Sequence, residues 1–320
     1  MTIKKQTIRV LALALSFAIV FGTVGVTAYE NNGDVKPEAS CHTTANMEFD
    51  IKFILNNGIV LNPDGSLSEE FINSLGIKMS DFRLRRLDMQ FMDTPGHAFF
   101  RHGWINRFQQ RGWEDQWQIM NRKRTSLAWP VTESGIEAAV RQAIEDGFSY
   151  QEWHFEVDWS YDSATLTKTR QFGIPLFKGY TKGDLLNFYE LRGLYQEILP
   201  HNLANMPWYE GQLSNIVVHG PVYYRRYEVR IDNIIDCIHF EGNNNFRIDV
   251  LVMTAEDGED VEFIVEASHA NMDMAANIGL ANAAATRESL YNFLGGIESG
   301  VILPITGLKA TTILTRYQSH

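Results

Sequence analysis

The sequence predicts an α+β protein in which an antiparallel sheet closes around a polar interior. Near its start, Glu48, Asp50 and Lys52 share one face of a predicted strand and apolar residues occupy the other, because strand side chains point alternately to opposite faces. The same alternation recurs in three later segments, residues 153–160, 222–230 and 261–268. Several strands with both signs of charge on one face predict a closed sheet whose interior can hold a ligand.

The remaining elements follow in chain order. Asn62-Pro63-Asp64-Gly65 predicts a turn, and Ser66 with Glu69 predicts a capping box for a short helix ending near Gly76. Strands are predicted over residues 48–53, 83–92, 104–111, 116–124, 153–160, 222–230, 234–240, 246–253 and 261–268. Helices are predicted over residues 133–146, 183–198 and 272–294. Strands interrupted by helices give the α+β class.

The first 28 residues have the form of a secretory signal. Basic residues precede an apolar run over residues 10–26, and Val26-Thr27-Ala28 has the small side chains of a signal-peptidase site. We therefore expect cleavage after Ala28, a secreted or extracytoplasmic mature protein and no stable membrane anchor. Residues 29–45 are polar and are predicted to be a disordered lead-in, followed by one folded domain over residues 46–317.

Composition limits the classes of partner and chemistry. The formal net charge is −11, which argues against nucleic acid as a partner. Cys41 and Cys237 are compatible both with one disulfide and with two separate thiols. The histidines have no metal-ligand spacing, and the sequence contains no nucleophile elbow, phosphate-binding loop or dinucleotide fingerprint.

Three motifs resemble one known family. Glu48-Phe49-Asp50-Ile51-Lys52 resembles the ExExK signature of the CYTH domain, or triphosphate tunnel metalloenzyme, family, with aspartate in place of the second glutamate. Residues 93–107 resemble the Asp-Thr-Pro turn of that family followed by a glycine and an arginine-bearing strand. Residues 117–124 stand where the family has a Leu-Thr-x-Lys-x-Arg pattern. The order and spacing of these motifs carry the resemblance.

The resemblance implies an eight-stranded antiparallel barrel, covered by helices, whose lumen holds a triphosphate between basic side chains while carboxylates bind a divalent metal, Mg²⁺ or Mn²⁺. Catalytic roles would fall to Glu48 and Asp50. Phosphate-binding roles would fall to Lys52, Arg107, Arg111, Arg122, Arg124, Arg226 and Arg230. Metal ligands would come from Glu48, Asp50, Glu156, Asp158, Glu262 and Glu266. Arginine suits phosphate geometry, and Mg²⁺ prefers oxygen ligands. By contrast, Asp93 and Thr94 are predicted to make local side-chain to backbone bonds.

Departures from the family pattern leave alternatives open. Gln109 replaces an arginine, Met120 replaces a threonine and Arg122 replaces a lysine. The first hypothesis is a secreted protein that binds triphosphate or polyphosphate together with a divalent metal. As an enzyme, it would hydrolyse this ligand in a metal-dependent reaction. The alternative is a non-catalytic protein that binds a small phosphate-rich anion. The third is a glycan-active protein, based on its tryptophans and carboxylates.

Overall fold

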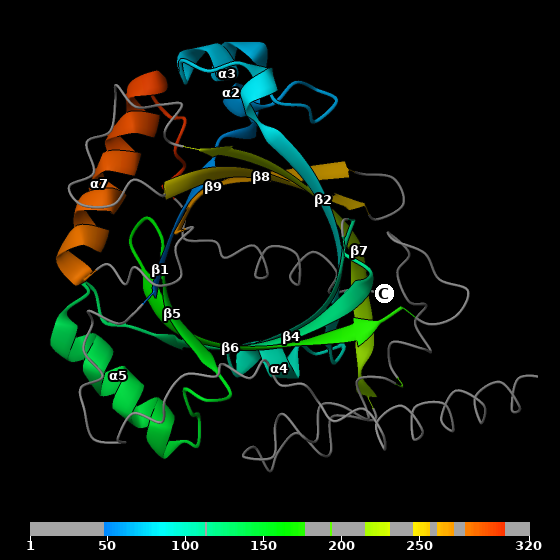
Figure 1. Ribbon diagram of the computed structural model, residues 1–320, viewed down its shortest axis with the longest axis vertical. Helices are drawn as coiled ribbons and strands as arrows, with labels where there is room; N and C mark the ends of the chain where they lie inside the picture. The colour runs from blue at the N-terminus through cyan, green and yellow to red at the C-terminus, as the bar shows by residue number, and fades with distance from the viewer. Residues whose placement is uncertain are drawn as a thin grey trace, which may run out of the picture. The chain divides into compact units, whose positions relative to one another are not determined.

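The computed structural model describes residues 48–112, 114–176, 193, 215–230, 246–256, 261–271 and 279–304. Within these residues the strands are β1 (Glu48–Leu55), β2 (Arg83–Asp93), β3 (Trp104–Arg111), β4 (Gln116–Ser126), β5 (His154–Trp159), β6 (Ala164–Pro175), β7 (Val217–Arg230), β8 (Phe246–Glu256) and β9 (Val261–Asn271). They form a closed barrel in the order β1-β5-β6-β4-β3-β2-β7-β8-β9 (Figure 1). The closed sheet predicted from the sequence is therefore confirmed.

Two details of the barrel differ from the prediction. The described chain contributes nine strands rather than eight, and β1 pairs with β5 in parallel, Glu48 lying opposite Glu156. The strand that sequence patterning missed is β6. Its inward positions carry Thr165, Thr167 and Thr169 rather than charges, so the alternation of charged and apolar residues that revealed the other strands is absent there.

The predicted helices are partly confirmed. Residues 133–146 contain α5 (Glu133–Glu145), and α7 (Leu280–Ile297) confirms the last helix, although residues 272–278 lie outside the described chain. The short helix α3 (Glu69–Ser74) is capped by Ser68, not by the predicted Ser66, which instead bonds to Asp64. Apart from Gly193, the predicted helix over 183–198 lies outside the described residues, as does the predicted strand over 234–240.

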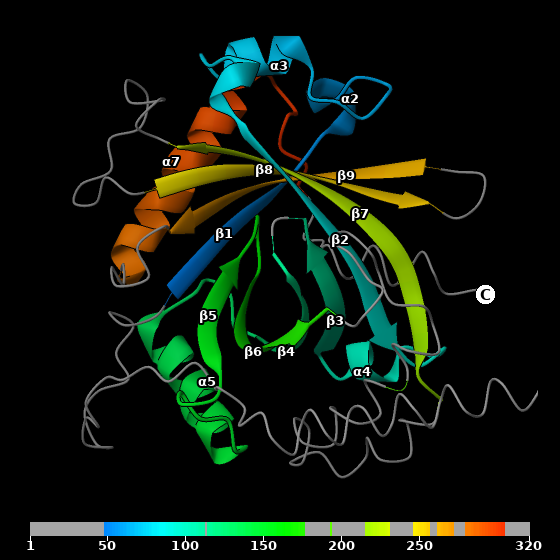
Figure 2. The same ribbon diagram turned by 45° about the vertical axis from the view of Figure 1, so that its right-hand side comes forward.

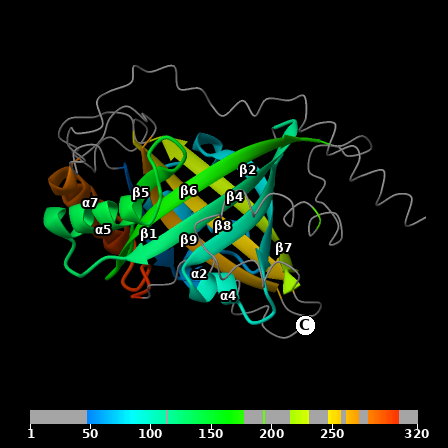
Figure 3. The same ribbon diagram turned by 90° about the horizontal axis from the view of Figure 1, so that it is seen from below.

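Helices cover one side of the barrel (Figures 1 and 3). The outward side chains of β1, Phe49, Ile51 and Phe53, are buried. Helix α7 packs on this strand, with the rings of Phe53 and Tyr291 5.8 Å apart, and α5 packs against β6. One part of the apolar core thus lies outside the barrel wall, beneath the helices, and the opposite faces of the same strands point inward. In the described chain no helix has the length and apolarity needed to span a membrane.

The connection between β2 and β3 is fixed by Asp93. Its Oδ1 accepts hydrogen bonds from the backbone N–H of Thr94 at 2.7 Å and of Phe99 at 3.0 Å, and its Oδ2 accepts one from Phe100 at 2.9 Å. These bonds hold α4 (Ala98–Arg101) against the end of β2 (Figure 2). The predicted structural role of Asp93 and Thr94 is confirmed.

Candidate functional site

Strand register places one set of side chains inside the barrel. Residues directly opposite each other on paired strands share a face, so the inward face can be followed from strand to strand. Glu48 lies opposite Glu156, Glu156 opposite Thr167, and Thr167 opposite Arg124. Arg122, two residues before Arg124, points to the same side of β4 and lies opposite Ile105 on β3. The charged faces predicted from separate segments of the sequence therefore meet in one interior.

Asp158 is the centre of a buried charge cluster. Lys52 Nζ donates a hydrogen bond to its Oδ1, and Arg122 and Arg124 approach its Oδ2 with Nη atoms at 3.7 Å and 3.5 Å. The Thr167 hydroxyl donates to the same Oδ2 at 2.6 Å. Arg122 also pairs with Glu156 at 2.8 Å. Three predicted phosphate-binding cations thus converge on two predicted metal-ligating carboxylates, which we call the Asp158 cluster.

Burial and neighbouring charges shift the pKa values of the cluster members in different directions. Burial lowers the pKa of Lys52, but Asp158 and Asp50 outweigh burial and the pKa lies above its usual value. Burial raises the pKa of Asp158, yet Lys52, Arg122 and Arg124 together hold it well below its usual value. For Glu156 burial prevails over Arg122, and its pKa is raised. Asp158 is therefore a firmly ionised partner, whereas Glu156 exchanges a proton more easily.

A second charged group lies across the interior. Arg226 on β7 pairs with Asp249 on β8 and, at 3.2 Å, with Glu228 on its own strand. Arg85 on β2 contacts Glu228 at 2.9 Å. Burial raises the pKa of Asp249 to about 7, although Arg226 lowers it in part. Sequence analysis did not single out Arg85 or Asp249, although Asp249 follows Arg247 at strand spacing in residues 246–253.

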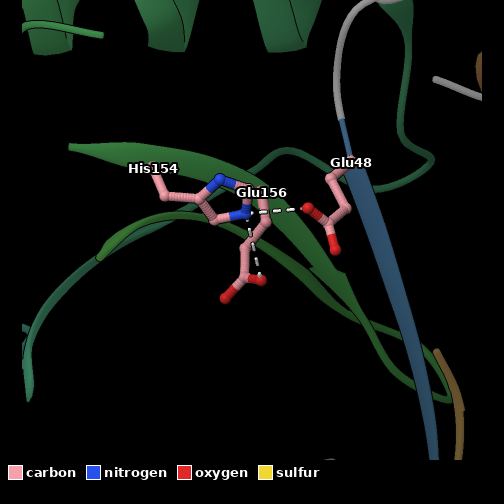
Figure 4. Close-up of side chains that lie close together, drawn as sticks. All are labelled: Glu48, His154 and Glu156. Carbon is pink, nitrogen blue, oxygen red and sulfur yellow. Dashed lines mark ion pairs between the residues drawn. The ribbon is translucent and has the colours of Figure 1, made fainter. Parts of the chain in front are cut away.

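Glu48, His154 and Glu156 form a group that could hold a metal ion. One nitrogen of His154 and one oxygen of each carboxylate all lie within 4.8 Å of one another. His154 Nε2 is 2.9 Å from Glu48 Oε2 and 3.9 Å from Glu156 Oε2 (Figure 4). The hydrogen bond with Glu48 raises the pKa of His154. Sequence spacing missed His154 as a ligand, because its partner Glu48 comes from another strand. The available signal was its place two residues before Glu156 on the polar face of residues 153–160.

The remaining residues predicted to bind phosphate or metal lie partly within these charge clusters and partly outside them. Asp50 contacts Lys52 at 2.5 Å, and Glu266 is buried where its charge acts on Lys52, Arg122 and Arg124. Arg107 lies opposite Met120 on the inward face. Arg111 pairs with Glu114 at 2.8 Å instead. Backbone register places Arg230 opposite Arg247 and Glu262 opposite Ala255, and their side chains lie outside what the structure describes.

Two of the substituted family positions, Gln109 and Met120, lie on the same wall. Gln109 Nε2 donates a hydrogen bond to Gln118 Oε1 at 2.5 Å, and both side chains are buried. Met120 is also buried and follows Gln118 on the inward face of β4. Beyond Arg107, this part of the wall is therefore uncharged.

Several solved structures are similar to this chain in fold. HpAC1 from Hippeastrum, a proposed adenylyl cyclase described as having a dominant triphosphatase activity, is 11% identical with a TM-score of 0.44, covering 83% of this chain and 95% of its own. A proposed adenylate cyclase from Bacillus halodurans is 12% identical with a TM-score of 0.36, covering 83% and 96%. The PH1012 protein of Pyrococcus horikoshii is 11% identical with a TM-score of 0.35, covering 81% and 96%.

The likeness to these structures concerns the fold alone. No protein-family model and no curated protein matches the sequence. With identities this low and TM-scores below 0.5, the function of this chain has to be inferred from its own residues.

Proposed function

We propose that the barrel binds a triphosphate-type anion together with a divalent metal on its inward face and hydrolyses a phosphoanhydride bond there. The observation that carries this proposal is the convergence of Lys52, Arg122 and Arg124 on Asp158 inside a closed barrel. Several cations aimed at one buried point are what a polyphosphate requires. Keeping them there without an anionic ligand requires carboxylates between them.

The charge pairing favours joint binding of anion and metal. Four inward cations have a carboxylate neighbour within 4 Å, in the pairs Lys52–Asp158, Arg122–Glu156, Arg85–Glu228 and Arg226–Asp249. A triphosphate must compete with these carboxylates for the cations. A divalent metal that takes the carboxylates frees the cations for phosphate, so each ligand strengthens binding of the other.

The residues present fit a divalent metal. Two carboxylates and one imidazole, those of Glu48, Glu156 and His154, have possible ligand atoms within 4.8 Å of one another. Asp50 on β1 offers a further carboxylate nearby. Carboxylate ligands suit Mg²⁺ and Mn²⁺, while an imidazole shifts the preference toward Mn²⁺. A metal held by Glu48 and Asp50 would polarise a phosphoryl group and orient water. Lys52, Arg107, Arg122 and Arg124 would hold the phosphate oxygens.

One observation favours a binder without catalysis. The neutral Gln109–Gln118 pair and Met120 occupy the wall next to Arg107, so the phosphate cradle has fewer donors there than the family pattern provides. The glycan-active hypothesis has less support, because four of the five tryptophans in the described chain are buried, namely Trp104, Trp117, Trp153 and Trp159. Only the exposed Trp129 is left as a surface for a sugar ring.

Phosphate release separates these functions. Purified protein is incubated with tripolyphosphate and with nucleoside triphosphates, with Mg²⁺, with Mn²⁺ and without metal. We expect metal-dependent release that is greater with Mn²⁺. Tight binding of tripolyphosphate without any release would support the binder, and absence of both binding and release would reject both functions.

Secretion is a separate proposal that rests on the first 28 residues. Mass spectrometry of exported protein should find Tyr29 at the N-terminus. An intact Met1 chain retained in the membrane would instead identify the segment as an anchor.

A further inference from the structure

Two lysines lie directly opposite each other on the outward side of the barrel, the side along which α5 packs (Figure 1). They are Lys123 on β4 and Lys168 on β6, and the residues next to them, Arg122 and Thr167, face the interior and contact Asp158. Like charges directly opposite each other on paired strands destabilise a sheet. Lys168 is only 1% exposed, so removing its charge from water adds a further cost.

Aromatic rings surround the two amines. Lys168 Nζ lies 5.3 Å from the ring centroid of Phe148, and Lys123 Nζ lies 5.8 Å from that of Trp104. Between ring centroids, Phe148 is 6.0 Å from Trp104 and 5.0 Å from Trp153. Aromatic faces attract a cation, but they do not neutralise its charge. The lysines therefore lie beneath an aromatic layer without the solvation that bulk water would give them.

Within the described chain, neither amine has a carboxylate within 4 Å. Lys168 Nζ donates a hydrogen bond to Thr125 Oγ1 at 2.6 Å, and Lys123 Nζ donates one to the backbone oxygen of His102. Asp146, the C-cap residue of α5, acts on both lysines through its charge but forms no ion pair with either. Both oxygen atoms that the amines contact are thus uncharged.

The chemical state of Lys168 follows from these surroundings. Burial lowers its pKa to about 8, and Lys123 lowers it as well, whereas Asp146 acts in the opposite direction. A large share of the amine is therefore neutral at slightly alkaline pH, and a neutral amine is a nucleophile. Thr125, which Lys168 contacts, is exposed, so a small uncharged electrophile has a short path to the amine.

We propose that Lys168 is a carbamylation site that takes carbon dioxide. The lone pair of neutral Nζ attacks the carbon of CO₂, an N–C bond forms as one C–O π bond opens onto oxygen, and the nitrogen releases a proton to solvent. The carbamate carries a negative charge where the ammonium carried a positive one. It pairs with Lys123 and accepts a hydrogen bond from the Thr125 hydroxyl. The modification lies outside the barrel wall and does not depend on the proposed function.

Carbon-13 spectroscopy detects the adduct directly. Wild-type protein is equilibrated with ¹³C-labelled bicarbonate, the source of CO₂, at about pH 8.5, which lies above the pKa of Lys168. We expect a carbamate resonance that Lys168→Arg lacks and that the exposed control Lys78→Arg retains. The α-amino group reacts in all three proteins, so its resonance cancels in the comparison. Absence of a Lys168-dependent resonance in folded wild-type protein would overturn the proposal.

Thermal unfolding in a sealed cell supplies a second test. Bicarbonate should raise the unfolding midpoint of wild-type protein by about 2 °C or more relative to chloride at the same pH and ionic strength, because only the folded chain holds the carbamate against Lys123. Lys123→Met should abolish this rise by deleting the counter-ion, whereas Lys78→Met should retain it. A rise of the same size in both variants would reveal a general salt effect and overturn the proposal.

Discussion

Two groups of side chains are buried inside the barrel, and different interactions determine their stability. One is the Asp158 cluster. The other, which we call the apolar end, comprises Met89, Phe91, Ile105, Val222, Leu251, Met253 and Ile264. The cluster removes Lys52, Arg122, Arg124 and Asp158 from water, which is costly even when the charges are paired. The apolar end gains free energy from burial of Met89, Met253 and their neighbours. The comparison indicates that stability comes from the apolar end and the helix-covered outer faces. The charged region is maintained at a cost, as expected of a ligand-binding site.

The largest expected effect separates metal binding from anion binding within the charged region. Glu48→Gln removes a carboxylate of the group formed with His154 and Glu156. We expect the rate of metal-dependent hydrolysis to fall by about 1000-fold, because metal stabilisation of phosphoryl charge is worth several kcal/mol. Tripolyphosphate affinity should fall much less, since Lys52, Arg122 and Arg124 remain. The matched control is Glu137→Gln on α5, which should retain full activity.

Asp158→Ala tests the cost of the buried charges. It leaves Lys52, Arg122 and Arg124 without their common partner, so the free energy of unfolding should fall by about 3–5 kcal/mol. Urea denaturation measures the change, with Asp162→Ala as an exposed control. Tripolyphosphate with Mn²⁺ should restore part of the loss by binding the freed cations. A change below about 1 kcal/mol would show that Asp158 does not hold the cluster together.

Met253→Ala makes the corresponding change in the apolar end. Shortening this buried side chain should destabilise the fold by about 2–5 kcal/mol through lost burial and a residual cavity. Because Met253 contributes no polar group, tripolyphosphate affinity of the folded variant should stay within about threefold of wild type. Calorimetry at a temperature where the variant is folded provides the measurement. A large affinity loss would mean that the two regions are not separate.

Arg107 marks the boundary between the regions, opposite Met120 on β4 and Phe91 on β2. Arg107→Ala should weaken tripolyphosphate binding by about 1.5–3 kcal/mol, the value of a charge-assisted hydrogen bond. Arg101→Ala, an exposed change on α4, is the control. Unchanged affinity in Arg107→Ala would move the phosphate site away from this boundary, toward Glu48.

The smallest expected effect concerns His154. Its pKa is raised in the folded protein by the hydrogen bond with Glu48, so protonated His154 stabilises the fold below the unfolded pKa near 6.5. This contribution is lost as pH rises through the folded pKa. In metal-free buffer, His154→Gln should lose less than about 1 kcal/mol at pH 5 and nothing at pH 9, because the side chain is nearly half exposed. A larger loss at pH 9 than at pH 5 would contradict the assignment.

Local patterning explains what the sequence could predict. Period-two alternation identified β1, β5 and β9 and placed Glu48, Asp50 and Lys52 on one face before any contact was known. The same criterion could not find β6, because threonines carry no charge signal. It also could not pair His154 with Glu48, or Arg226 with Asp249, since these contacts depend on the register between distant strands. The apolar end escaped notice for the same reason: its residues come from five strands.

The central claim is that the inward face takes a triphosphate and a divalent metal together. The most direct measurement is calorimetric titration of wild-type protein with tripolyphosphate, in Mn²⁺ and again in metal-free buffer. We predict binding at least about 10-fold tighter with Mn²⁺, within the usual range of coupling between two sites. Equal or tighter binding in metal-free buffer would contradict the account, because the cations would then accept phosphate without release from their carboxylates.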